Sequence, residues 1–265
     1  MSAAKVNCLV LLLLFTPNLL AFGQNTKFNF RMSGEGEPVI VIVTAMGEQL
    51  NSWKSNQRRL SSISTVVTYD RMGLGKSAPT DVPRTIANMA SELDAFLAFN
   101  KIKSPYVLVG HSLGAFIIRK YQNDHPEKVS GMILIDPVHE YQFDSLMARK
   151  SEEERVKTEK DREIFVNGLP EGQRKEAILY HEQRGEMMNV KFPGDIPVTI
   201  LATFRVGPGA TIEDRKLKRR LMDGWIARAP QIKLITTEKS GHYIQDDEPE
   251  LLVDAVEAMI KVLRN

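Results

Sequence analysis

A serine between two glycines is the first group in this sequence that could do chemistry. Ser112 stands at the centre of a G-H-S-L-G segment at residues 110–114, after the apolar run 106–109 and before apolar residues at helical spacing. Such a strand-to-helix turn exposes the serine hydroxyl, and the glycines allow the neighbouring backbone to approach closely. The positive end of the following helix would favour an oxyanion beside the serine. We therefore predict that Ser112 is a nucleophile.

A serine nucleophile needs a base, and the base needs an acid that fixes its tautomer. Of the five histidines, only His242 combines the end of an expected strand, a glycine neighbour and a place late in the chain. Asp136 directly follows the apolar run 129–135 and is the acid that we expect. Asp214 is the alternative acid.

Apolar runs that alternate with helical patterns must position these groups. We expect strands at 39–43, 65–69, 106–109, 129–135, 196–203 and 232–236, and helices that include 85–99 and 252–263. This alternation predicts an α/β fold with a mostly parallel sheet and helices on both faces. Parallel strands present functional loops at their carboxyl ends, where Ser112, Asp136 and His242 stand.

The alternation stops between residues 141 and 192, where the sequence becomes charged and helical with interleaved apolar residues. We interpret this segment as a helical lid over the active site, because insertions on a rigid fold often carry specificity. A helical insertion that only stabilises the domain is the alternative. The dense basic residues at 215–220 follow two acids, and we interpret them as a solvated helix face.

Residues 1–23 have the pattern of a secretory signal peptide. Lys5 precedes the apolar core 9–15, Pro17 breaks it, and the small-x-small segment 21–23 would be the cleavage site. A membrane anchor needs about 20 uninterrupted apolar residues. We therefore expect an exported protein, periplasmic or secreted, with no membrane anchor after cleavage and a mature domain at 24–265. Cleavage would also remove Cys8, the only cysteine.

Composition and charge exclude several other classes. A chain of 265 residues with 43% hydrophobic and 26% charged residues suits one globular domain. A net charge of +2 without a basic stripe argues against nucleic acid. The G-K-S at 75–77 lacks the upstream glycine of a phosphate loop, since Asp70 stands there. Because the histidines are scattered, we expect no metal and no cofactor. Nothing in the sequence indicates an oligomeric state.

Five segments in order resemble the α/β-hydrolase fold superfamily, in particular serine hydrolases of the esterase and lipase kind. They are 44–53, 70–77, 110–114, 134–137 and 240–244. The resemblance covers nearly the whole mature chain. It implies Ser112 as nucleophile, Asp136 as acid, His242 as general base, and an oxyanion hole made by the backbone N–H groups of Met46 and Leu113.

Two departures from the family pattern stand out. The frequent His-Gly pair of the oxyanion loop is Thr44-Ala45 here. The acid commonly follows the strand that ends near Thr203, but residues 201–205 contain no carboxylate. Some members place the acid one strand earlier, at the position of Asp136. The resemblance implies hydrolysis of a small-molecule carboxylic ester, in preference to an amide, through an acyl-enzyme. The alternatives are a cofactor-free perhydrolase, a C–C bond hydrolase, or a non-catalytic binding protein.

Overall fold

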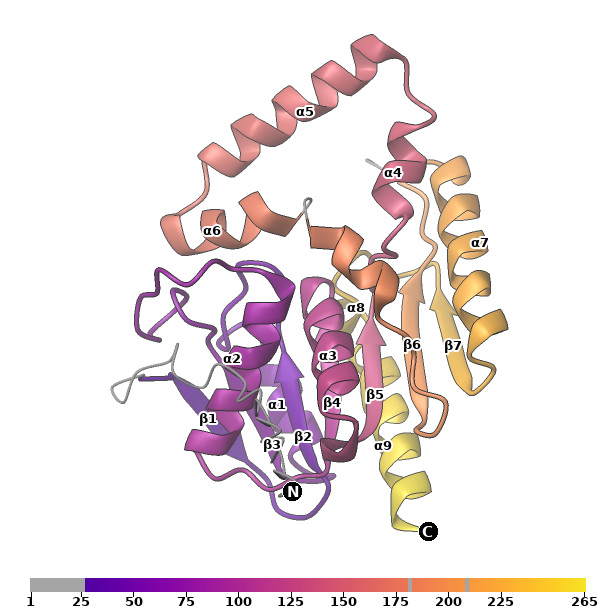
Figure 1. Ribbon diagram of the computed structural model, residues 1–265. Coiled ribbons are helices and arrows are strands. Elements are labelled where there is room, and N and C mark those ends of the chain that lie inside the picture. The colour runs from indigo at the N-terminus through magenta and orange to yellow at the C-terminus, as the bar shows by residue number, and fades with distance from the viewer. Residues whose placement is uncertain (1–26, 181–182, 208–209) are drawn as a thin grey trace, which may run out of the picture.

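The computed structural model describes residues 27–180, 183–207 and 210–265 (Figure 1), so the expected signal peptide lies outside the described residues. The described strands form one sheet in the order β1-β3-β2-β4-β5-β6-β7. They are β1 (Phe30–Ser33), β2 (Val39–Val43), β3 (Val66–Tyr69), β4 (Tyr106–His111), β5 (Val129–Ile135), β6 (Val198–Thr203) and β7 (Ile232–Thr237). β1 runs antiparallel to β3, and the other neighbours are parallel. The predicted fold class is confirmed.

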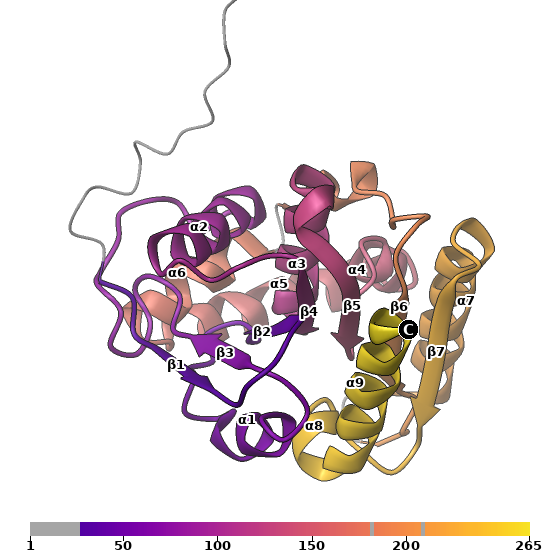
Figure 2. The same cartoon turned by 90° about the horizontal axis from the view of Figure 1, so that it is seen from below.

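Helices cover both faces of this sheet (Figure 2). Side chains of α2 (Ile86–Phe99), α3 (Leu113–Asp124) and α7 (Ile212–Arg228) join the core on one face. Those of α1 (Lys54–Leu60), α8 (Ile244–Asp247) and α9 (Pro249–Arg264) join the core on the other. Along β2, Val41 packs into the first core and Ile40 and Ile42 into the second, because side chains alternate along a strand. Both faces of the central strands are therefore buried.

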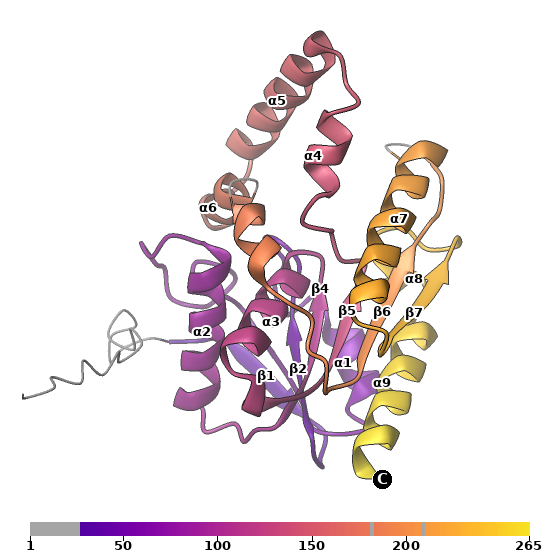
Figure 3. The same ribbon diagram turned by 45° about the vertical axis from the view of Figure 1, so that its right-hand side comes forward.

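A helical segment follows β5 and rises beyond the carboxyl ends of the strands (Figures 1 and 3). It contains α4 (Gln142–Met147), α5 (Glu152–Asn167), α6 (Glu171–Tyr180) and the 3-10 helix Gln183–Asn189. α6 lies against the loop after β3, where a side chain at Gly172 would overlap the carbonyl oxygen of Gly73. α5 lies farther out, and its Val156, Ile164 and Phe165 are exposed.

Candidate active site

The backbone at Ser112 is strained in the way that the glycine pattern predicts. Ser112 stands between β4 and α3 with φ 52° and ψ −113°, a left-handed conformation that disfavours residues with a side chain. A side chain at Gly114 would overlap the carbonyl oxygen of Val43, and one at Gly110 would overlap Gly114 itself. The glycines thus let α3 start against the end of β2. In the described part of the chain, the Ser112 hydroxyl has no hydrogen-bond partner.

The strand ends are joined to one another by main-chain hydrogen bonds. The N–H of Ser112 donates to the carbonyl of Ile135 (3.0 Å), and the N–H of Asp136 donates to that of Leu201 (2.7 Å). Each residue that leaves a strand is thereby tied to the next strand of the sheet. Because these bonds join only backbone atoms, most side chains do not affect them. They therefore hold the backbone of Ser112 and Asp136 in place.

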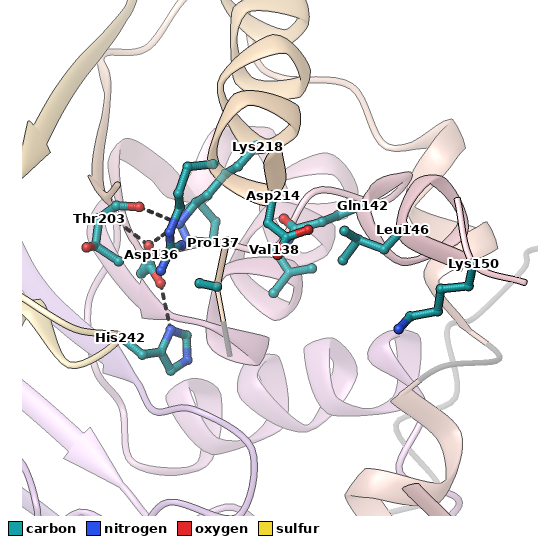
Figure 4. Close-up of a pocket in the computed structure, with 12 residues that line it drawn as sticks. Asp136, Pro137, Val138, Gln142, Leu146, Lys150, Thr203, Asp214, Lys218 and His242 are labelled. Carbon is teal, nitrogen blue, oxygen red and sulfur yellow. Dashed lines mark hydrogen bonds and ion pairs between the residues drawn. The ribbon is translucent and has the colours of Figure 1, made fainter. Parts of the chain in front are cut away.

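The structure brings Asp136 and His242 together (Figure 4). Nδ1 of His242 lies 2.7 Å from Oδ2 of Asp136, whose backbone also has a left-handed φ of 40°. Burial alone would raise the pKa of Asp136, but the hydrogen bond from His242 and the charge of Lys218 hold it below its usual range. The His242 side chain remains 42% exposed and lines a pocket.

Asp214, the alternative acid, caps the start of α7. Its Oδ2 accepts hydrogen bonds from the backbone N–H and the hydroxyl of Thr211, which forms a capping box at the start of α7. Within the described residues, its carboxylate makes no hydrogen bond to His242. The geometry therefore favours Asp136 as the partner of the histidine.

Lys218 is a site residue that the sequence analysis missed. Its Nζ lies 2.5 Å from Oδ1 of Asp136 and donates to the carbonyl of Thr203 (3.1 Å), while its side chain is only 5% exposed. The interpretation of 215–220 as a solvated face was wrong for this residue. Lys218 shares its helix face with the buried Met222 and Trp225 at i+4 and i+7, and this spacing was the available signal.

Side chains hold some of the backbone N–H groups of the loop after β2. The N–H of Ala45 donates to the carboxylate of Glu48 (2.8 Å), and that of Gly47 donates to Glu176 (2.7 Å). Among the described residues, the N–H groups of Met46 and Leu113 have no acceptor. Met46 lies between the two residues whose N–H groups these carboxylates hold.

A buried ion pair ties this loop to α6. Nε and Nη2 of Arg71 lie 2.7 and 2.9 Å from the carboxylate oxygens of Glu176. The same guanidinium donates to the carbonyls of Thr44 (2.8 Å) and Ala45 (2.6 Å). Glu176 and Arg71 are both fully buried, and no local pattern in the charged sequence of α6 singles out Glu176. The helical segment thus helps to hold the loop.

His111, next to the serine in sequence, faces away from it and supports the histidine loop. Its Nε2 lies 3.0 Å from the carbonyl oxygen of His242 and its Nδ1 lies 3.5 Å from the Glu48 carboxylate. Burial opposes the charge of Glu48, but the hydrogen bond and charge of His111 lower its pKa to about 2. His111 therefore links the loop after β2 to the loop that carries His242.

A pocket of about 440 Å³ opens beside Asp136 and His242, between α4 and α7 (Figure 4). Its walls combine apolar Val138 and Leu146 with polar Lys150 and Arg215. No cluster of potential metal ligands was found among the described residues. None of the described helices is long and apolar enough to span a membrane.

Comparisons with known proteins agree with this architecture. "Uncharacterized protein YqjL" of Bacillus subtilis is 24% identical over 223 residues, which are 83% of this chain and 82% of that protein. "Probable transporter efuK" of Hormonema carpetanum is 34% identical over 140 residues, but the match covers 50% of this chain and only 20% of that protein.

Solved structures show the same fold. A thermophilic esterase from Thermogutta terrifontis has a TM-score of 0.65 at 18% identity and covers 91% of this chain and 95% of its own. The epoxide hydrolase CorEH has a TM-score of 0.65 at 15% identity and covers 92% and 98%. Residues 38–209 match the protein family described as alpha/beta hydrolase fold. The chain belongs to the α/β hydrolase fold family.

Proposed function

We propose that this protein is a serine hydrolase that cleaves a carboxylic ester, in preference to an amide, through an acyl-enzyme. The 2.7 Å contact between Asp136 and Nδ1 of His242, at the strand ends where the backbone of Ser112 is strained, carries the proposal. A carboxylate can only accept at this contact, so Nδ1 holds the proton and Nε2 is free to act as a base. The family membership supports hydrolysis as the general chemistry.

In the proposed reaction, the Ser112 oxygen attacks the ester carbonyl while Nε2 of His242 takes the hydroxyl proton. The tetrahedral oxyanion is stabilised by the N–H groups of Met46 and Leu113, which have no acceptor in the described part of the chain. His242 then gives the proton to the departing alcohol, and water hydrolyses the acyl-enzyme by the same steps. Removing one oxyanion donor typically costs about a hundredfold in rate.

The pocket beside His242 suits the leaving group. His242 must protonate the departing oxygen, and the pocket of about 440 Å³ borders His242 on the side of α4 and α7. Its mixed apolar and polar walls fit a small organic alcohol rather than a long alkyl chain. The helical segment 141–192 supplies α4 to this pocket, and we propose that it acts as the lid.

The decisive experiment measures hydrolysis of p-nitrophenyl esters of increasing acyl length. Ser112→Ala should remove the activity, whereas Ser91→Ala, at an exposed serine of α2, should leave it unchanged. A fluorophosphonate probe should label Ser112, as peptide mass spectrometry would show. A wild-type protein that neither turns over any ester nor reacts with the probe would instead indicate a binding protein.

We further propose that residues 1–23 direct export and are removed. Expression with the full leader, followed by cell fractionation and N-terminal sequencing, tests this. The mature chain should begin at Gln24. An intact N-terminus on protein retained in the cytoplasm would contradict it.

A further inference from the structure

We propose that Lys218 is a positioning residue that holds the Asp136 carboxylate and offsets its charge, so that the carboxylate stabilises the protonated form of His242 less strongly. The inference rests on the proposed serine hydrolase function. It adds a fourth residue, from α7, to the expected group of three.

The contacts show that Lys218 is built into the site. Asp136 accepts three hydrogen bonds: from His242 on Oδ2, and from Lys218 (2.5 Å) and the backbone N–H of Thr203 (3.1 Å) on Oδ1. Lys218 also donates to the carbonyl of Thr203, so the ammonium bridges the ends of β5 and β6. Figure 4 shows His242 and Lys218 reaching Asp136 from different elements.

The acid of related hydrolases commonly follows the strand that corresponds to β6. In this chain, residues 201–205 at the end of β6 contain no carboxylate. β6 instead presents the main chain of Thr203, whose N–H contacts Asp136 and whose carbonyl contacts Lys218. An acid located one strand earlier is therefore held from the β6 side by a cation and a backbone donor. Together these contacts fix the orientation of the Asp136 carboxylate.

The charge of Lys218 has a consequence for the base. A buried carboxylate stabilises the imidazolium form of its histidine, and a cation on the same carboxylate weakens that stabilisation. Lys218 is 95% buried as a side chain, so solvent screens this effect little. The Lys218–Asp136 pair is close to neutral as seen from His242, which makes the imidazolium easier to deprotonate.

Other charged groups also lie near His242 and Lys218, and Lys150 lines the same pocket as both. His242 also packs against His111 and Tyr243, and Glu48 lies behind His111. Asp247 accepts from the N–H of Gly241, beside the histidine. Near Lys218, Arg215 opposes its charge, Arg219 stacks on Phe204, and Asp214 caps α7. Of these, only Lys218 directly contacts the carboxylate that contacts His242.

The test is the pH dependence of kcat/KM for p-nitrophenyl acetate in Lys218→Met, which removes the charge and keeps most of the side-chain volume. The acidic limb of the profile should move to higher pH by about one unit or more. Lys218→Arg should restore the limb to near its wild-type position. Lys216→Met, at an exposed lysine of the same helix, should leave it unmoved.

Lys218→Gln provides a second uncharged variant if Lys218→Met fails to fold, and it should show the same shift. An unmoved acidic limb in the uncharged variant, with activity lowered equally at every pH, would overturn the proposal and make Lys218 a structural residue.

A measurement independent of turnover separates the two proposals. The titration midpoint of the His242 ring, followed by NMR and assigned with His242→Gln, should rise in Lys218→Met. A rise without ester hydrolysis would reject the serine hydrolase function but keep the role of Lys218. Ester hydrolysis that depends on Ser112, without a rise of the His242 midpoint in Lys218→Met, would keep the serine hydrolase function but reject the role of Lys218.

Discussion

The two sides of the site are each held by a buried cation, but the two cations act differently. On the side of the proposed oxyanion hole, called the oxyanion side below, Arg71 pairs with Glu176 and holds the loop carbonyls of Thr44 and Ala45. On the acid side, Lys218 pairs with Asp136, which itself contacts His242. Glu176, the partner of Arg71, contacts the backbone of Gly47, whereas Asp136, the partner of Lys218, contacts the proposed base His242.

The two ion pairs should therefore respond differently to substitution. Loss of Glu176 should weaken the fold and, through the loop, the geometry of the site. Loss of Lys218 should change the pH range in which the proposed base His242 supports activity. Both buried ion pairs therefore hold their surroundings in place, but the pair of Lys218 and Asp136 also changes the charge that lies beside His242.

The largest effect is expected from breaking the oxyanion side. Glu176→Ala leaves the buried Arg71 guanidinium without its counter-charge and the N–H of Gly47 without an acceptor. Breaking a buried pair by removing one partner typically costs about 3–5 kcal/mol. Urea unfolding should show a loss of free energy of unfolding of this size.

Two controls accompany this measurement. Glu176→Gln keeps an acceptor for Gly47 and should lose less stability. Glu171→Ala removes an exposed carboxylate from the same helix and should change stability by no more than about 0.5 kcal/mol. A loss below about 1 kcal/mol in Glu176→Ala would mean that α6 is not anchored through this pair.

An effect of intermediate size is expected at His139, near Asp136, where the free energy of unfolding should depend on pH. His139 follows Asp136 closely and stacks on Trp225, and burial lowers its pKa to about 4. In the unfolded chain a histidine takes up a proton below about pH 6.5. The free energy of unfolding should therefore fall by up to about 3 kcal/mol as the pH falls from about 6.5 to about 4.

His139→Phe should flatten this fall, as urea unfolding at several pH values would show, while His125→Gln should not. On the oxyanion side, Glu48 keeps its charge in this window because its pKa is about 2. Equal slopes for wild type and His139→Phe between pH 4 and 6.5 would refute the assignment.

The smallest effect is expected at α5, which lies outside both sides. Val156 is 60% exposed, so Val156→Ser should change the free energy of unfolding by no more than about 0.5 kcal/mol. Val166 on the same helix is buried, and Val166→Ser should cost clearly more. Similar losses from both substitutions, in thermal or urea unfolding, would show that the exposed face of α5 packs against something in solution.

Most of the fold could be predicted because the parallel strands are continuous β-branched runs between helical patterns. The buried run Val39–Val43 is typical of these strands. α1 was not predicted, because its seven residues are mostly polar and no side chain caps its start. Short elements of this kind depend on tertiary contacts rather than on a local pattern.

The candidate site could be predicted only where chemistry is local. Ser112 directly follows a strand and has a glycine two residues away on each side. Asp136 also follows a strand directly, and His242 follows a glycine a few residues after the last strand. Glu176 and Lys218 lie 105 and 82 residues from their partners, within runs of other charged residues. Nothing local marks which charge of such a run is buried, apart from the apolar spacing that Lys218 shares with Met222.

The chain of main-chain hydrogen bonds across the strand ends, from Ser112 to Ile135 and from Asp136 to Leu201, bears on how such a protein can change. These bonds survive most side-chain substitutions, so the starting points of the reactive groups stay in place while their identities vary. Evolution or a designer can therefore replace the groups one at a time without rebuilding the frame. A substitution that changes the chemistry of such a side chain therefore leaves these backbone hydrogen bonds intact, which lowers the risk that it also prevents folding.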